Sequence, residues 1–262
     1  MFKKFVSIFL IAILCCSFLA ACGGGGNNNQ NQGQDEARSY LVGTDTTFAP
    51  FEFEDENGNH TGIDIVLLET IGEEMGFEIE WSILGFSAAV TALEAEQVEA
   101  VMAGMSITEE RKLKYDFTDS YYDAAVAVAV KAGSEYTSLE DLRGKPVVAK
   151  NATTGAQYAE EVAAEYELDI IYVDESAIMY QYVESDLAEA CFEDYPIVQY
   201  EIGRGTISLE VVNQSSYSFP TALAVLKGNS PELIADFNEG LAKLKANGEY
   251  RRILDSFFNP QK

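Results

Sequence analysis

Short apolar runs alternate with segments of helical period along most of the chain. Strands are predicted at the apolar runs 40–43, 81–84, 98–102, 146–149, 169–173 and 187–192. Helices are predicted where apolar residues recur every three or four positions, beginning near 64, 87, 155, 176, 230 and 250. Regular alternation of the two is typical of an α/β fold with sheets rich in parallel strands.

Polar and small residues predict where several of these helices begin and end. Asp64 and Ser87 are assigned as N-caps, because short oxygen-bearing side chains accept hydrogen bonds from the free N–H groups of a helix start. Gly76 ends the helix that begins near Asp64. Pro231 follows Ser230 as the first residue of a C-terminal helix.

A weak internal repeat relates residues 93–104 to residues 183–194. The identical pairs are Glu94 and Glu184, Glu99 and Glu189, and Ala100 and Ala190. A duplicated unit would give two similar lobes, with Gly104 and Asp194 at equivalent strand ends, where open α/β sheets bind ligands. Helix–turn–strand segments also converge on similar sequences, so convergence is the alternative.

The N-terminus has the pattern of an export signal. Lys3 and Lys4 precede an apolar stretch shorter than the about 20 residues that a bilayer span needs. Residues 19–22, Leu-Ala-Ala-Cys, resemble a lipobox, where bacterial lipoproteins are diacylated on the cysteine and cut before it. We expect a signal peptide over 1–21 and lipid on Cys22. An ordinary signal peptide cleaved nearby is the alternative.

The segment after Cys22 predicts a flexible tether. Residues 23–34 are all glycine, asparagine or glutamine and cannot bury apolar surface, so the tether is taken to span 22–38. Two of the four cysteines leave with the signal and Cys22 carries lipid. Cys191 therefore has no partner for an internal disulfide.

Composition removes several classes of function. Forty-three acidic against seventeen basic residues give a net charge of −26, which repels nucleic-acid phosphates, so no nucleic-acid partner is expected. His60 is the single histidine, and with four cysteines this excludes most metal clusters and histidine-dependent nucleophilic catalysis. We expect no metal and no cofactor. A binding protein, or an enzyme that uses carboxylates, remains.

Six motifs together resemble one known family. They are GTDTTFAPFEF at 43–53, GID at 62–64, AGMSITEER at 103–111, DFTDSYY at 116–122, SLEDLRGK at 138–145 and ACFEDYP at 190–196. In this order they resemble the polar amino-acid-binding proteins of ABC importers, solute-binding family 3, over about residues 39–258. The chain departs from that pattern at Val66, Glu96, Glu99 and residues 221–222. Family members usually have glycine where Glu96 stands.

The resemblance implies a type II periplasmic-binding-protein-like α/β fold, with two lobes and a ligand cleft between them. Lobe 1 would comprise 39–122 and 221–262, and lobe 2 would comprise 123–220, with a hinge near 121–126 and 219–223. It implies a free L-amino acid as ligand and the permease and ATPase of an ABC importer as partners. A lipid anchor would hold the protein on the outer face of the cell membrane.

Arg111 is the strongest candidate for contact with a ligand. Thr108 reads as an N-cap, which puts Arg111 in a first helical turn, where the helix dipole disfavours a cation. A residue that is unfavourable in its local structure, as this arginine would be, indicates a functional role. A guanidinium can hold a carboxylate with two hydrogen bonds. A surface arginine paired with Glu109 or Glu110 is the alternative.

The other candidates lie near predicted strand ends. Asp194 would accept from the ligand ammonium, or cap the helix that starts at Pro196. Ser106 adds a hydroxyl, and Thr153 and Thr154 precede a helix whose N–H groups favour an anion. The resemblance implies that the carbonyl of Gly104 accepts from the ligand ammonium and that the rings of Phe48 and Phe86 lie on either side of the ligand side chain. It also implies that the far end of that side chain contacts Asp45, Lys150 and Glu193. Core packing and exposed charge are the alternatives for these last five side chains.

The charges of this far end favour a carboxamide ligand. An acidic side chain would face both Asp45 and Glu193, whereas a carboxamide can donate to the carboxylates and accept from Lys150. Glutamine is therefore expected, with arginine or another cationic amino acid as the alternative. A sensory binding module, or an enzyme similar to the cyclohexadienyl dehydratases that resemble this fold, is less favoured, because Arg111 and Asp194 complete an amino-acid clamp without chemistry.

Overall fold

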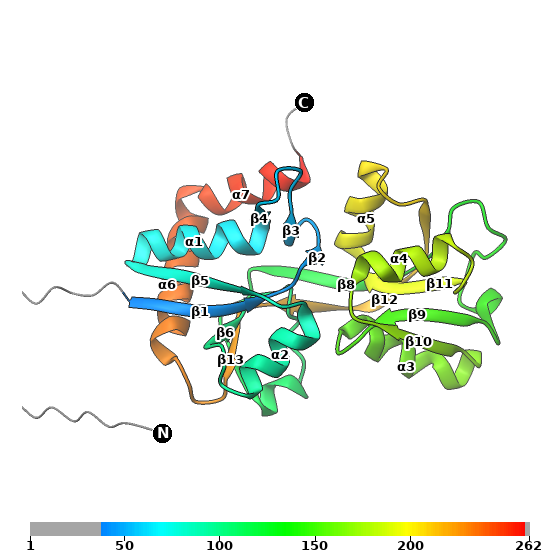
Figure 1. Cartoon of the computed structure of the whole chain (residues 1–262), viewed down its shortest axis with the longest axis horizontal. Helices are drawn as coiled ribbons and strands as arrows, with labels where there is room; N and C mark the ends of the chain where they lie inside the picture. The colour runs from blue at the N-terminus through cyan, green and yellow to red at the C-terminus, as the bar shows by residue number, and fades with distance from the viewer. Residues whose placement is uncertain (1–37, 260–262) are drawn as a thin grey trace, which may run out of the picture. The chain divides into compact units, whose positions relative to one another are not determined.

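The structure, a computed structural model, describes residues 38–259 (Figure 1). The predicted signal peptide, the predicted lipidation site Cys22 and nearly all of the predicted tether lie outside the described residues. Arg38, assigned to the end of the tether, instead begins a strand, because it pairs with Phe77 in register. Within 38–259 no helix is both long and apolar enough to cross a membrane.

The first sheet has the order β5-β1-β6-β13-β7. Its strands are β1 (Arg38–Thr44), β5 (Phe77–Ile83), β6 (Ala100–Val101), β7 (Tyr115–Phe117) and β13 (Ala224–Leu226). β1 runs parallel to β5 and β6, while β13 runs antiparallel to β6 and β7. A small sheet of β2 (Thr47–Phe48), β3 (Glu52–Glu54) and β4 (His60–Thr61) follows β1.

Helices cover both faces of this sheet. They are α1 (Ile63–Met75), α2 (Phe86–Glu94), α6 (Pro231–Asn247) and α7 (Glu249–Phe258). Side chains alternate between the faces of a strand, and accordingly Ala100 and Met102 pack with α1, α6 and α7, whereas Val101 and Ala103 pack with α2. Gly240 of α6 lets that helix approach α1, since a Cβ there would lie 2.7 Å from Ile71.

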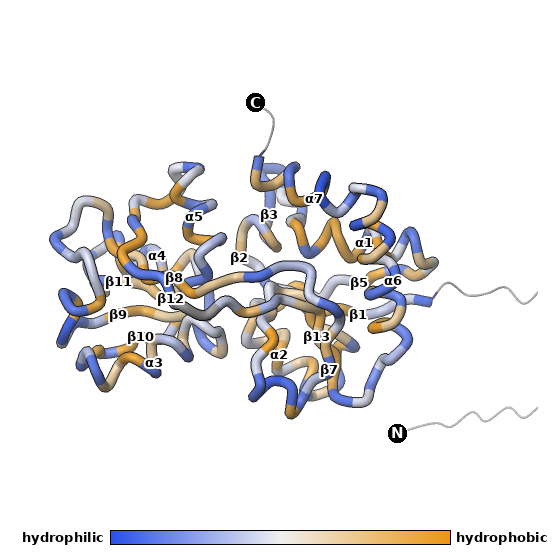
Figure 2. Tube along the Cα trace, turned by 180° about the vertical axis from the view of Figure 1, so that it is seen from behind, coloured by the Kyte–Doolittle hydropathy of each residue, from blue (hydrophilic) through white to orange (hydrophobic). Residues whose placement is uncertain are grey.

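The second sheet has the order β10-β9-β11-β8-β12. Its strands are β8 (Tyr122–Lys131), β9 (Pro146–Lys150), β10 (Asp169–Val173), β11 (Ala190–Asp194) and β12 (Leu209–Thr221). Its helices are α3 (Thr154–Tyr166), α4 (Ser176–Glu184) and α5 (Tyr195–Arg204), and a short 3₁₀ helix, Glu140–Leu142, precedes β9. Along β8, Val126 and Val128 pack with α3, and Ala127 and Ala129 pack with α4 and α5. Figure 2 shows hydrophobic residues along strands such as β9 and β13.

Two chain segments pass between the sheets, one from β7 to β8 and the other from β12 to β13. Their backbones bond to each other: the N–H of Tyr121 donates to the carbonyl of Thr221, and that of Thr118 to the carbonyl of Leu223, each at 3.0 Å. The predicted two-lobed α/β fold is confirmed. The strands of the second sheet begin at Tyr122 and end at Thr221, one residue beyond each end of the range expected for lobe 2. Most of the two ranges expected for the hinge, 121–126 and 219–223, lies within β8 and β12, and the chain between the strands is shorter than those ranges.

Two predicted helix caps are wrong. Gly62 and Gly85 occupy the N-cap positions of α1 and α2, with φ of 139° and 86°, values that side-chain-bearing residues rarely adopt. Asp64 and Ser87 therefore lie inside the first turns, and Asp64 points into the protein. One strand also begins earlier than predicted: β5 begins at Phe77, whereas the predicted strand covers 81–84.

The sequence repeat corresponds to one local structure found twice. After α2 the chain turns through Ala95 and Glu96, and after α4 it turns through Ser185 and Asp186. Ala95 and Ser185 have φ, ψ of −90°, 5° and −92°, 8°, and Glu96 and Asp186 have positive φ of 54° and 58°. The two segments lead into β6 and β11, whose far ends meet at the site described next.

Candidate functional site

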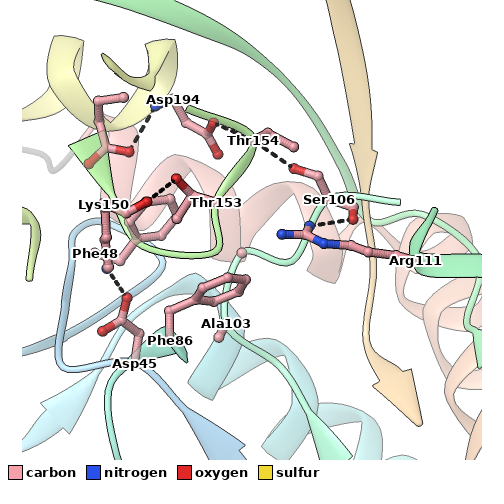
Figure 3. A pocket seen from close by; sticks show the side chains of 12 residues that line it. Asp45, Phe48, Phe86, Ala103, Ser106, Arg111, Lys150, Thr153, Thr154 and Asp194 are labelled. Carbon is pink, nitrogen blue, oxygen red and sulfur yellow. Dashed lines mark hydrogen bonds and ion pairs between the residues drawn. The ribbon is translucent and has the colours of Figure 1, made fainter. Parts of the chain in front are cut away.

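A polar pocket lies where the carboxyl ends of strands from both lobes meet (Figure 3). Its cavity volume is only about 20 Å³, room for ordered water, so the two walls lie close together. Its lining consists of Asp45, Phe48, Phe86, Ala103, Gly104, Ser106, Arg111, Lys150, Thr153, Thr154, Glu193 and Asp194. The structure thus brings all eleven predicted site residues together, and adds Ala103.

Lobe 1 supplies one wall of the pocket. Asp45 directly follows β1, Phe48 ends β2, Phe86 begins α2, and Gly104 and Ser106 follow β6. Parallel strands bring such residues to one edge of a sheet, which explains why positions far apart in sequence converge. Ala103, the lining residue that was not predicted, belongs to the 103–111 motif, but its small apolar side chain carried no chemical signal.

Lobe 2 supplies the opposite wall in the same way. Lys150 ends β9, Thr153 and Thr154 begin α3, and Glu193 and Asp194 end β11. Thr153 is the N-cap of α3, since its Oγ1 accepts from the N–H of Ala156 at 3.2 Å. The N-terminus of a regular helix, which favours negative charge, therefore faces the pocket.

Arg111 is buried, with 8% of its surface exposed. Its Nη1 donates to the carbonyl of Ser106 at 2.7 Å, its Nη2 donates to the carbonyl of Ala152 at 2.8 Å, and its guanidinium lies 5.4 Å from the Phe86 ring centre. The surface alternative is wrong, because Glu109 pairs with Lys112 instead. Burial lowers the pKa of Arg111 to about 10, so the group is charged at neutral pH.

The local setting of Arg111 differs from the predicted helix start. It begins a three-residue 3₁₀ helix, Arg111–Leu113, and its N–H donates to Thr108 Oγ1 at 3.2 Å. The predicted contact with Thr108 exists, but so short a helix has no substantial dipole to oppose the cation. Burial of the guanidinium at the pocket, rather than a dipole conflict, distinguishes this arginine.

Asp194 stands at the N-cap position of α5 without capping it. Its side chain makes no cap hydrogen bond, and its Oδ1 accepts from Thr154 Oγ1 at a long 3.4 Å. Burial, and then the neighbouring charge of Glu193, raises the pKa of Asp194 to about 7, although Arg111 opposes the shift. The carboxylate retains acceptor capacity toward the pocket.

Lys150 and Asp45 form an ion pair from one wall of the pocket to the other. Each is 1% exposed. The ammonium also lies 5.2 Å from the Phe48 ring centre and donates to Ser176 Oγ at 3.4 Å. An ion pair this deeply buried is sensitive to any further charge brought against it, because little water screens it.

Glu193 adds a second carboxylate beside this ion pair. Its Oε1 accepts from the N–H of Asp194 at 2.8 Å, and its Oε2 accepts from Tyr180 Oη at 3.3 Å. Burial raises the pKa of Glu193, while Lys150 lowers it. Tyr180 and Ser176 support the pocket from α4, and neither was identified from the sequence, because each reads as an ordinary helix residue.

Position 104 requires glycine, because its backbone lies against the ring of Phe48. Its φ is 58°, and a Cβ on it would lie 2.4 Å from the Phe48 ring. Its N–H donates to Asp64 Oδ2 at 2.8 Å. A larger residue would displace the aromatic ring that lines the pocket.

The chain therefore has a two-lobed α/β fold with a closed, charged pocket between its lobes. Residues 40–260 match the family model of bacterial extracellular solute-binding proteins, family 3. The chain belongs to this family, and the membership predicted from the motifs is confirmed.

Similar proteins match most of the chain. The arginine-binding extracellular protein ArtP of Bacillus subtilis (strain 168) is 29% identical over 256 residues, 97% of this chain and 98% of its own. A solved ancestral arginine-binding protein bound to glutamine is 35% identical, with a TM-score of 0.77, covering 84% of this chain and 97% of its own. The ancestral amino-acid-binding protein AncCDT-1, a precursor of cyclohexadienyl dehydratase, is 32% identical, with a TM-score of 0.76, covering 84% and 96%.

Proposed function

We propose that this protein is the substrate-binding component of an ABC importer for a polar amino acid, and that its ligand is glutamine. The names of the relatives support the amino-acid class, because they bind arginine, glutamine or other amino acids. The buried Lys150 at the side-chain end of the pocket is the observation that carries glutamine.

The main-chain end of the ligand would lie between Arg111 and Asp194. The guanidinium has five N–H donors, and its two bonds to protein carbonyls leave donors for an α-carboxylate. Ser106 and the start of α3 add further donors. Asp194 would accept from the α-ammonium, with the carbonyl of Gly104 beside it. Both charges of a zwitterion are matched in a site that excludes most water, which strengthens each contact.

The side chain of the ligand would end near Asp45, Lys150 and Glu193, with Phe48 and Phe86 along its length. A carboxamide carries both a donor and an acceptor, so it can donate to a carboxylate and accept from the Lys150 ammonium. A guanidinium or ammonium group on the ligand would pair with the two carboxylates but would be repelled by the ammonium of Lys150. Because Lys150 is 1% exposed, little water screens this repulsion. Glutamine therefore satisfies all three groups.

Arginine is the second candidate, because ArtP is named for that ligand. Asp45 and Glu193 give the side-chain end one net negative charge, as a cationic ligand requires. If Lys150 swung out of the pocket when arginine bound, the objection to a cation would disappear.

The remaining parts of the proposal concern the setting of the protein. Ligand binding would close the two lobes by bending at the two crossings, and the closed form would dock on the permease and ATPase of the importer. A lipid on Cys22 would hold the protein on the outer face of the cell membrane. Cell fractionation of a Cys22→Ala variant tests the anchor, since membrane retention of that variant would contradict it.

We infer that the protein binds its ligand without catalysis. Dehydratase activity is the alternative, because the chain is similar to AncCDT-1, a precursor of cyclohexadienyl dehydratase. Each charged group of the pocket has a role in holding either the zwitterion or the side chain of an amino acid, which leaves none for acid–base chemistry.

Calorimetry of the mature chain against the twenty amino acids tests the proposed ligand. We expect glutamine to bind most tightly and arginine at least tenfold more weakly. Tighter binding of arginine would replace glutamine by the second candidate. Absence of binding by every amino acid, or turnover of a prephenate-like compound, would refute the proposed function.

A further inference from the structure

Two acidic side chains are buried together behind the pocket wall of lobe 1. Glu52 of β3 and Asp64 of α1 are both 0% exposed. Their carboxyl groups lie close enough for a hydrogen bond between the side chains. Neither lines the pocket, so the proposed ligand contacts do not use them.

The hydrogen bonds of the two groups are very unequal. Asp64 Oδ2 accepts from the N–H of Gly104 at 2.8 Å and from Tyr121 Oη at 2.7 Å. Asp64 Oδ1 and both carboxyl oxygens of Glu52 are buried and have no partner elsewhere in the described residues. If both groups were ionised, the negative oxygens that lack donors would repel each other strongly in so dry a place, which favours a proton between the two groups.

The surroundings decide which group carries that proton. Burial raises the pKa of Asp64 to about 7, but its two good donors, the N–H of Gly104 and the Tyr121 hydroxyl, favour its charged form. Glu52 receives none, and burial and then the charge of Asp64 raise its pKa well above its ordinary value. The other charged and titratable groups that act on the pair are Asp45, which favours protonation of Glu52, Lys150, which opposes it, and the Tyr121 hydroxyl.

We propose that Glu52 is a neutral carboxylic acid that donates a hydrogen bond to Asp64 Oδ1, and that this pair positions the pocket residue Gly104. This role rests on the proposed function, in which Gly104 contacts the ligand. The proton gives Asp64 a donor at Oδ1 as well as two at Oδ2, which fixes the carboxylate in one orientation. Asp64 then holds the backbone of Gly104 at its left-handed φ of 58°.

The same pair connects the pocket to the hinge. Tyr121, the second donor to Asp64, lies in the first crossing, where its N–H bonds to Thr221 in the second. On the other side, the backbone of Glu52 pairs with Phe48, the ring that contacts Gly104. One buried proton therefore organises a pocket glycine, a pocket aromatic residue and a crossing segment.

Three variants test this assignment on the mature chain. Glu52→Gln keeps the shape and supplies an N–H donor to Asp64 without any titration, whereas Glu52→Ala removes the donor. Glu54→Gln, on the same strand but exposed, is the matched control. The readouts are the infrared band of a protonated carboxyl group at pH 8, the pH dependence of urea unfolding, and ligand affinity.

We expect the wild type and Glu54→Gln to retain the protonated-carboxyl band at pH 8 and Glu52→Gln to lose it. Unfolding ionises Glu52, so the folding constant of the wild type should fall up to tenfold per pH unit above neutrality relative to Glu52→Gln. Glutamine should bind Glu52→Gln at least tenfold more tightly than Glu52→Ala.

A missing band in the wild type would overturn the neutral Glu52. Equal affinities of Glu52→Gln and Glu52→Ala would overturn the positioning role. If Glu52→Ala does not fold, the comparison of wild type with Glu52→Gln by infrared and unfolding still decides the protonation. A wild type that binds no amino acid would refute the proposed function, while the infrared and unfolding results would still judge the carboxyl pair.

Discussion

The guanidinium of Arg111 in lobe 1 donates a hydrogen bond to the backbone carbonyl of Ala152 in lobe 2, at 2.8 Å. Ala152 has a positive φ of 62°, a conformation that the turn between β9 and α3 imposes on a residue with a side chain. The group proposed to hold the α-carboxylate therefore also joins the lobes. Ligand binding and lobe closure would then depend on the same side chain.

Replacing Arg111 should nearly abolish binding. Arg111→Ala leaves a buried ligand carboxylate without its main partner, a loss of about 3–5 kcal/mol, while about 8 kcal/mol corresponds to micromolar affinity. Arg111→Lys keeps the charge but loses the planar fork, so it should bind weakly as well. Calorimetry checks both variants. Arg143→Ala, which removes an exposed arginine bonded to the carbonyl of Glu165, should bind like the wild type. Micromolar binding by Arg111→Ala would show that Arg111 does not hold the ligand carboxylate.

Replacing Lys150 should change selectivity rather than remove binding. Lys150→Met keeps the length of the side chain but removes the ammonium that would donate a hydrogen bond to the carboxamide oxygen of glutamine. Glutamine should bind at least tenfold more weakly, and arginine should bind equally well or better, because two carboxylates then face it without a competing ammonium. Lys131→Met, which breaks an exposed ion pair with Asp186, is the control. Unchanged glutamine affinity of Lys150→Met would make the cationic-amino-acid importer the leading interpretation.

Ligand affinity should fall in mild acid. The pKa of Asp194 is about 7 because burial and Glu193 disfavour its charge, and only the charged form can pair with the ligand ammonium. Protonation below pH 7 must therefore be reversed on binding, so affinity at pH 6 should be about tenfold lower than at pH 8. Calorimetry in buffers of different ionisation enthalpy should detect proton release at pH 6. Asp194→Asn should bind weakly at both values, and an Asp194→Asn profile as steep as that of the wild type would assign the effect to another group.

Glycine at position 96 should stabilise the fold. Glu96 has φ of 54°, and a residue with a side chain loses about 1–2 kcal/mol in that region, part of which glycine recovers. Glu96→Gly should therefore raise the free energy of unfolding in urea by up to about 1 kcal/mol. The same change at Glu73, an exposed position inside α1, should lower it by about 1 kcal/mol. A destabilised Glu96→Gly variant would mean that the Glu96 side chain contributes more than its backbone strain costs.

Ligand should make the protein more compact. If the two crossings form a hinge, saturating glutamine shifts the population toward the closed state, in which Arg111 reaches Ala152. Small-angle X-ray scattering should then give a smaller radius of gyration with glutamine than without it. The Arg111→Ala variant should not respond to the same glutamine concentration. An unchanged radius for the wild type at saturation would contradict closure by hinge bending.

Much of the site was predictable because its chemistry is carried by side chains within recognisable motifs. Arg111 and Asp194 each stand at a strand or helix boundary, and the parallel-strand arrangement brings such boundaries together. The likeness to a family then identified Phe48, Lys150 and the other residues of the far end. Sequence reasoning could not separate a capping Asp194 from an uncapped one, since both have the same neighbours along the chain.

What the sequence by itself determined is the alternation of strands and helices, the order of motifs and the residues whose charges meet in the pocket, because these depend on local pattern and residue type. Only the tertiary structure decided how those residues are paired. The contact of Arg111 with the Ala152 carbonyl uses a backbone group that no residue type marks. The burial of Glu52 against Asp64 contradicts the expectation that Asp64 caps a helix. Both depend on segments far apart in the chain, and the cost of burying a charge is set by neighbours that only the folded chain brings close.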